Sequence, residues 1–142
     1  MVDAADFVPL RTFGPKQVEE IHSLYLNEWW ANRRTLDETR RVVANSTMNF
    51  GIVRRSTGEL VSYARVLSDL TFKAVIFDVI VRPDHRGYRL GAKIMDDIIS
   101  EPRLAAVSQF ELYCLPDMEP FYARWGFSSD VGSVRLMRRV TT

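Results

Sequence analysis

The chain has 142 residues, of which 46% are hydrophobic and 26% charged, a balance typical of globular proteins large enough to bury a core. Its 19 Lys and Arg against 18 Asp and Glu leave a net charge of +1, which argues against a protein that coats nucleic acid. One cysteine excludes an internal disulfide, and two histidines make a structural zinc site improbable, so we expect no metal. The length is that of one domain, so we expect a single domain over residues 1–142. Because the sequence shows no signal-peptide pattern and no long apolar stretch, we expect a cytoplasmic location and no membrane contact.

Two helices are expected after a short extended start. Gly14-Pro15 opens a pattern in which apolar residues recur with the helical period as far as Trp29. Thr35 and Glu38 form a capping box, which predicts a second helix ending near residue 44.

From Met48 the pattern changes to that of β-strands. Residues 50–54 and 60–67 flank a turn and predict a hairpin, and the apolar run 74–81 predicts a strand buried on both faces. The remaining elements are predicted as a helix over 90–100, a strand over 110–114, a short helix between Asp117 and Gly126, and a last edge strand over 134–140. The order α-α-β-β-β-α-β-α-β indicates an α/β or α+β fold with a mixed central sheet flanked by helices.

The segment 79–92, VIVRPDHRGYRLGA, carries a binding signal. A buried strand ends there, a basic loop follows, and a helix begins, so free amides and the helix dipole form an anion site. Gly87 and Gly91 permit close approach to the backbone, and Arg86 and Arg89 supply donors suited to phosphate oxygens. The P-loop and dinucleotide-binding spacings of glycine are both absent. The pattern therefore favours a phosphate or pyrophosphate ligand.

This loop resembles the acyl-CoA-binding signature Q/R-x-x-G-x-G/A of the GCN5-related N-acetyltransferases. Arg86 stands in its first position and Gly91 in its last, while Arg89 replaces the middle glycine. Downstream, FYARWGF over residues 121–127 is similar to the family's F-Y-x-x-x-G-F segment. The resemblance covers roughly residues 49–127 and implies a single-domain acyl-CoA N-acyltransferase fold. The implied reaction moves an acetyl group from acetyl-CoA, as co-substrate, to a primary amine.

The resemblance also implies roles for individual residues. In this family the fourth strand splays from the fifth, and the pantetheine arm lies in the gap. The main chain of Val79, Ile80 and Val81 would bind that arm and polarise the thioester carbonyl. Tyr122 matches the tyrosine that protonates the departing thiolate. The pyrophosphate would be held by Arg86, Gly87, Tyr88, Arg89, Leu90, Gly91 and Ala92.

The general base is less well specified. Asp78 is the first candidate, because it interrupts an apolar strand beside the expected thioester position. Alternatively, Asp78 has a structural role, in which neighbouring amides or an arginine such as Arg65 bind its carboxylate. The other candidate bases are Asp69, Glu111 and Asp117.

For several other residues we expect mainly structural positions. We expect His85 to be an exposed loop residue and Cys114 to lie in the core. Of Trp29 and Trp30, one is expected in the core and the other in the wall of an acceptor pocket.

We expect the acceptor to be a small-molecule amine, with a protein N-terminus or lysine as the alternative. A non-catalytic acyl-CoA-binding sensor or partner module is the competing hypothesis, and the charge balance disfavours a nucleic-acid-binding module. The last strand offers an edge that can pair with a second copy to form a homodimer. The sequence contains no motif that identifies the acceptor.

Overall fold

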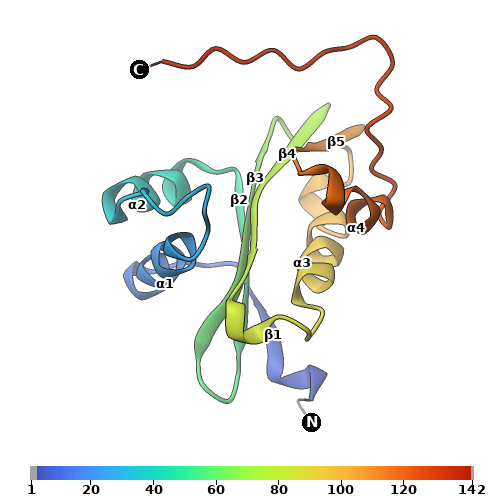
Figure 1. The fold of residues 1–142 in the computed structure, drawn as a ribbon. Helices are drawn as coiled ribbons and strands as arrows, with labels where there is room; N and C mark the ends of the chain where they lie inside the picture. The colour runs from blue at the N-terminus through green and yellow to red at the C-terminus, as the bar shows by residue number, and fades with distance from the viewer. Residues whose placement is uncertain (1–2, 142) are drawn as a thin grey trace.

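The computed structural model describes residues 3–141. It contains a mixed five-stranded sheet in the order β1-β2-β3-β4-β5, with helices on both faces (Figure 1). The strands are β1 (Phe7–Leu10), β2 (Met48–Arg54), β3 (Glu59–Ser68), β4 (Lys73–Val81) and β5 (Gln109–Leu112). The helices are α1 (Pro15–Leu26), α2 (Leu36–Asn45), α3 (Leu90–Ile99) and α4 (Glu119–Ala123). None of these helices, within residues 3–141, is long and apolar enough to cross a membrane.

The first four strands are antiparallel neighbours, and β5 joins β4 in parallel after the crossover through α3. The short extended start becomes β1, which pairs with β2 from Phe7 opposite Arg54 to Leu10 opposite Gly51. The predicted fold class, a mixed sheet flanked by helices, is confirmed.

The helix boundaries follow their caps. In α2 the Thr35 hydroxyl accepts from the Glu38 amide at 3.0 Å, and the Glu38 carboxylate accepts from the Thr35 amide at 2.9 Å. Helix α1 ends three residues before Trp29, where the Asn27 amide bonds back to carbonyls of the last turn. Trp29 and Trp30 consequently lie in a turn and are 73% and 38% exposed, so the expectation that one of them belongs to the core is wrong.

The core has two layers, one on each face of the sheet. Helix α3 packs Ile94 and Ile98 against one face, and α1 packs Ile21 and Tyr25 against the other. The strand buried on both faces is β3 rather than β4 as predicted, because β3 is flanked by paired strands and covered by helices along most of its length. From Phe77 onward β4 is largely only half-buried.

The predicted last strand over 134–140 is not formed. This segment has no strand partner among the described residues, is exposed throughout, and runs away from the body of the molecule (Figure 1). An exposed segment can bond its backbone to water instead of to a neighbouring strand, so without a partner its alternating pattern alone does not make it a strand.

Candidate functional site: a cavity beside a splayed strand

Strands β4 and β5 separate halfway along β4. Their pairing runs from Lys73 opposite Gln109 to Ile76 opposite Leu112, whereas β4 continues to Val81. Residues 77–81 therefore have a strand partner only on the β3 side within the described part of the chain. The free edge presents main-chain donors and acceptors to which an extended ligand can add like a further strand. Val79, Ile80 and Val81, the residues expected to bind pantetheine, lie on this edge.

A β-bulge interrupts β4 at the start of the free edge. Tyr63 pairs with Ile80 but Arg65 pairs with Phe77, so Asp78 and Val79 both lie opposite Ala64. Asp78 adopts φ of 59°, a left-handed conformation that is uncommon for residues other than glycine. Bulges of this kind redirect side chains near functional sites.

The carboxylate of Asp78 is held by three donors from distant parts of the chain. Its Oδ2 accepts from the Tyr25 hydroxyl at 2.8 Å, from Arg34 Nη1 at 2.8 Å and from Arg65 Nε at 2.7 Å. Burial favours the protonated form of Asp78, but the hydrogen bonds and charges of Arg34 and Arg65 outweigh it, so its pKa lies below the usual value. The alternative reading, that an arginine such as Arg65 satisfies Asp78, is confirmed.

The second oxygen of Asp78 is in a different position. All three donors contact Oδ2, and Oδ1 accepts no hydrogen bond within the described residues. No buried side-chain nitrogen or oxygen in that part of the chain lacks a partner, so Oδ1 retains contact with solvent. An ionised carboxylate with one open oxygen can bind a cationic or N–H group, but its lowered pKa makes it a weak base.

The other candidate bases serve local structure or lie in the open. Asp69 Oδ1 accepts from the amides of Thr71, Phe72 and Lys73 and thereby closes a turn. Glu111 pairs with Lys73 at 3.1 Å, and Asp117 is exposed in the short turn before α4.

A cavity of about 550 Å³ lies where β4 ends and α3 begins. It is lined by Val81, His85, Arg86, Gly87, Arg89, Leu90, Gly91, Ala92, Phe121 and Arg124. The structure thus brings most of the expected pyrophosphate residues together, while the ring of Tyr88 packs instead on Phe7, with ring centroids 5.6 Å apart. Phe121 and Arg124 were not assigned from the sequence, although both lie in the FYARWGF segment that marked this region.

The backbone at the start of α3 explains the loop's residue pattern. Arg89 is the N-cap of α3 and has φ of 60°, a conformation for which glycine is the usual residue. At Gly91 a Cβ would lie 3.4 Å from Phe121 Cζ and 3.9 Å from Val81 Cγ2. A Cβ would thus fit beside α4 at ordinary van der Waals distance, whereas a larger side chain at position 91 would project into the cavity and cover the amides of the first turn of α3. The uncovered amides form a cradle that fits a pyrophosphate.

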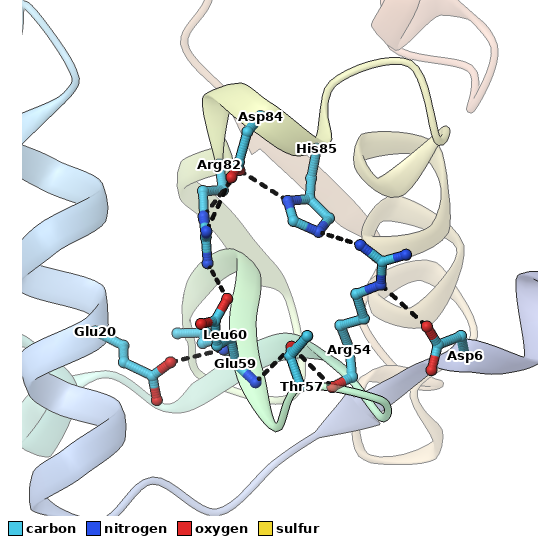
Figure 2. A network of polar contacts seen from close by, with 9 residues as sticks. All are labelled: Asp6, Glu20, Arg54, Thr57, Glu59, Leu60, Arg82, Asp84 and His85. Atoms are coloured by element: carbon cyan, nitrogen blue, oxygen red, sulfur yellow. Dashed lines mark hydrogen bonds and ion pairs between the residues drawn. The ribbon is translucent and has the colours of Figure 1, made fainter. Parts of the chain in front are cut away.

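A network of polar contacts holds the loop between β4 and α3 in place (Figure 2). His85 Nδ1 lies 2.8 Å from Asp84 Oδ1, and Asp84 also pairs with Arg82. On its other side His85 contacts Arg54, which pairs with Asp6 at 3.0 Å. His85 is only 6% exposed, so the expectation of an exposed loop residue is wrong.

Tyr122 is buried in α4, with its ring against those of Phe121 and Phe127. Burial raises the pKa of Tyr122 to about 12, so the phenol stays protonated at neutral pH. Its hydroxyl makes no hydrogen bond within residues 3–141, yet no buried polar side-chain atom there is unsatisfied, so the hydroxyl is accessible. Cys114, expected in the core, is exposed just beyond the end of β5.

A second cavity, of about 320 Å³, lies along the segment that connects α1 to α2. It is lined by Trp29, Trp30, Ala31, Asn32, Arg33, Arg34 and Glu38. Arg34 connects it to the splayed strand, since the same guanidinium binds Asp78 and lies 4.5 Å from the centre of the Tyr25 ring. Among the described residues, no cluster of His, Cys, Asp or Glu is arranged to hold a metal ion.

Comparison with known sequences decides the family. The sequence model of the Acetyltransferase (GNAT) domain matches residues 9–140. The chain belongs to the GNAT acetyltransferase family. An uncharacterised N-acetyltransferase, ycf52, of Pyropia yezoensis is 31% identical over 120 residues, which are 83% of this chain and 68% of that protein. Serotonin N-acetyltransferase 2 of Oryza sativa subsp. japonica is 33% identical over 118 residues, 79% of this chain and 59% of that protein.

Solved structures show the same GNAT fold. A GNAT-family acetyltransferase structure from Xanthomonas campestris pv. campestris superposes with a TM-score of 0.81, at 28% identity, over 95% of this chain and 93% of that one. The mixed five-stranded sheet flanked by helices is therefore the fold of a GNAT acetyltransferase.

Proposed function

We propose that this chain transfers the acetyl group of acetyl-CoA to the primary amine of a small molecule. One observation carries the proposal: the cavity at the start of α3 is lined by Val81, the last residue of the free edge of β4, and Asp78 lies three residues earlier on that same edge. A basic cavity, an open strand edge and a carboxylate, which suit a phosphate group, an extended arm and a reacting amine, are thus found on neighbouring residues.

The cavity supplies the phosphate contacts. The amides of the first turn of α3 and the guanidinium groups of Arg86, Arg89 and Arg124 would hold the pyrophosphate. Arg86, whose side chain is exposed, also lies 3.5 Å from Glu28, a long contact that a phosphate can replace.

The free edge of β4 supplies the contacts to the reacting end. Main-chain groups of Val79, Ile80 and Val81 would bind the pantetheine amides, and one N–H would donate to the thioester oxygen as negative charge develops on it. The amine nitrogen forms a bond to the acyl carbon, the carbon–sulfur bond breaks, and Tyr122 donates its hydroxyl proton to the sulfur. Tyr122 regains that proton from solvent.

Asp78 is the candidate acceptor for the amine's proton. Its open Oδ1 would take a hydrogen bond from the incoming amine, directly or through one water, and the proton would pass on to solvent. The lowered pKa of Asp78 suits this transient role, because the carboxylate is ionised whenever the substrate arrives.

The second cavity favours an acceptor with an aromatic ring. Trp29 and Trp30 present two exposed indoles beside Arg34, and Arg34 contacts Asp78. Flat aromatic surfaces stack on such side chains. The rice relative, named as a serotonin N-acetyltransferase, supports an arylalkylamine as the first class to test.

The test is release of free CoA thiol from acetyl-CoA in the presence of tryptamine-like amines, aminosugars, polyamines and peptides with a free N-terminus. Turnover with an arylalkylamine that falls strongly in Tyr122→Phe supports the proposal. Turnover with peptides alone would transfer the assignment to a protein substrate. Tight CoA binding without turnover on any amine would establish the non-catalytic alternative.

The cytoplasmic location stays a prediction. Two relatives, from Oryza sativa subsp. japonica and Arabidopsis thaliana, are named as chloroplastic proteins.

A further inference from the structure

Asp78 is shared by two arginines, and its single negative charge cannot balance both. Arg34 lies 2.8 Å from Oδ2 and Arg65 lies 2.7 Å from the same oxygen, with side chains that are 30% and 14% exposed. Within residues 3–141 neither arginine forms an ion pair with any other acidic residue. Arg65 is enough to neutralise Asp78, so the charge of Arg34 is left for another anion. A cation partly removed from water favours such a counter-ion.

Aromatic rings surround both guanidinium groups and limit their contact with water. The guanidinium carbon of Arg34 lies 4.5 Å from the centre of the Tyr25 ring and 5.4 Å from that of Trp30. The guanidinium carbon of Arg65 lies 4.8 Å from the centre of the Phe77 ring. Guanidinium groups are weakly hydrated and stack on rings in this way, while the N–H groups at their edges stay free to bind an anion.

The two arginines retain N–H groups that a ligand can reach. Arg34 binds Asp78 through Nη1, and Arg65 binds it through Nε. A guanidinium carries five N–H donors, so each arginine has more donors than this contact uses. No buried side-chain nitrogen in the described part of the chain lacks a hydrogen-bond partner, so the nitrogens without one are open to solvent.

The second cavity gives an anion access to Arg34. Its lining contains Arg33 and Arg34 but one acidic residue, Glu38. The carboxylate of Glu38 already caps α2 by accepting a hydrogen bond from the Thr35 amide at 2.9 Å. A basic hollow of this kind concentrates ligands of negative charge.

An amine and an acid would be bound at adjoining atoms of this cluster. Asp78 accepts from Arg34 through Oδ2, whereas Oδ1 of the same carboxylate accepts no hydrogen bond within the described residues. An amine at Oδ1 and an acid at the free nitrogens of Arg34 must therefore be close together in the ligand, as they are in an α-amino acid, where one carbon atom carries both. A single carboxylate also matches the one unbalanced charge, and its two oxygens suit the guanidinium fork.

We propose that the acceptor is an α-amino acid with an aromatic side chain, whose carboxylate binds Arg34. This inference rests on the acetyl transfer proposed above and adds an acidic group to its substrate. The amino group faces Oδ1 of Asp78, and the aromatic ring packs on the indoles of Trp29 and Trp30 in the second cavity. Arg65 neutralises Asp78, and Arg34 determines the specificity for the carboxylate.

The first experiment compares acceptors that differ in the carboxylate. Tryptophan, tryptamine and tryptophan methyl ester are assayed with the wild type by release of free CoA thiol from acetyl-CoA. We expect kcat/KM for tryptophan to exceed both other values by about tenfold or more, the factor that one hydrogen bond to a charged group supplies. The methyl ester controls for the lower basicity of an amine beside a carbonyl group. Alanine, which has no ring, should be a poorer acceptor than tryptophan.

The outcomes separate this inference from the function on which it rests. Equal or faster turnover of tryptamine or of the ester would overturn the carboxylate site and leave the acetyl transfer standing. Equal turnover of alanine would overturn the aromatic side chain. Absence of turnover with every amine and amino acid would remove the acetyl transfer and this inference with it.

The second experiment assigns the preference to Arg34. Arg34→Gln removes the charge while Arg65 stays paired with Asp78, so the ratio of kcat/KM for tryptophan to that for tryptamine should fall to near one. Arg34→Lys keeps the charge and should keep part of the preference. Arg40→Gln makes the same change of charge at an exposed position of α2 and should leave the ratio unaltered. Loss of folded protein lowers both rates alike, so an unchanged ratio in Arg34→Gln would overturn the proposal.

Discussion

Nε2 of His85 lies 3.2 Å from Nη1 of Arg54, a group that can only donate hydrogen bonds. The imidazole nitrogen must therefore accept, which leaves the ring proton on Nδ1, where it is donated to Asp84. His85 is thus fixed in one tautomer between two charged residues, directly before Arg86 at the wall of the cavity. It links strand β2, through Arg54, to the loop expected to hold phosphate.

Replacing His85 by leucine removes both hydrogen bonds while keeping much of the volume. Because Arg54 then loses a buried acceptor, we expect the free energy of unfolding to fall by about 1–3 kcal/mol. The loop should also lose its fixed position, so KM for acetyl-CoA should rise more than kcat falls. His85→Gln, which restores an acceptor, should recover part of both. If the free energy of unfolding falls as expected in His85→Leu but KM for acetyl-CoA does not change, His85 supports the fold and does not position the loop.

Arg89 combines a left-handed backbone with a positive charge, and two variants separate them. Arg89→Gly relieves the backbone strain, so its melting temperature should equal or exceed that of the wild type. Arg89→Ala keeps the strain and removes the charge, and it should be the less stable of the two. We expect CoA affinity to change by less than about tenfold, or ~1.4 kcal/mol, in Arg89→Gly. A far larger loss shared by both variants, measured by calorimetry, would make Arg89 a principal phosphate ligand.

Gly91 tests the phosphate cradle. Its Cβ position meets Phe121 only at van der Waals distance, so Gly91→Ala should fold normally. Gly91→Val adds methyl groups between α3 and the cavity, and CoA binding should weaken sharply. In thermal-shift measurements CoA should stabilise the wild type, because it binds only the folded state, and adenosine without phosphates should do little. Equal stabilisation by the two ligands would argue against the cradle.

Tyr122→Phe removes only the hydroxyl. If that hydroxyl protonates the thiolate, kcat and kcat/KM should fall together by ~10²-fold, with CoA affinity nearly unchanged. Because burial raises the pKa of Tyr122 to about 12, ionisation of this residue should not lower wild-type kcat anywhere below about pH 10. Full activity of the variant with an unchanged pH profile would make Tyr122 a packing residue.

The ion pairs of Asp78 should make the stability of the protein depend on pH under acidic conditions. Its pKa is lowered in the folded state, so its contribution is complete above the unfolded pKa of about 3.9 and is lost as pH falls through the folded pKa. Asp78→Asn leaves Arg34 and Arg65 without their carboxylate, which should cost about 3 kcal/mol, the lower end for breaking a buried pair. Below pH 4, the free energy of unfolding measured with urea should therefore fall more steeply with decreasing pH for the wild type than for the variant. Parallel pH curves would contradict the assigned role.

Much of the fold was predictable because its signals are local. The capping box of α2, the hairpin of β2 and β3 and the apolar stripe of α3 lie within short windows of sequence. The predictions are wrong where contacts with distant segments decide whether a strand forms or where a helix ends. The strand pattern over 134–140 has no partner among residues 3–141, and the turn containing Trp29 ends α1 before the helical period does.

The same distinction separates the site residues. The glycine and arginine pattern of residues 86–92 is contiguous and indicated the cavity directly. Phe121 and Arg124 reach that cavity from α4 and the residue after it, and Arg34 reaches Asp78 across 44 positions. No periodicity or spacing encodes such contacts, because the sheet and its bulge create them.

The unpaired edge of β4 has a consequence for how the protein behaves when no ligand lies along it. Residues 77–81 expose an open row of backbone groups beside apolar side chains, the kind of surface through which chains adhere to one another. A ligand that lies along this edge shields it as well as reacting there. We therefore expect the purified chain to precipitate more slowly on warming with CoA than without it, and Gly91→Val to lose that protection, as turbidity measurements would show.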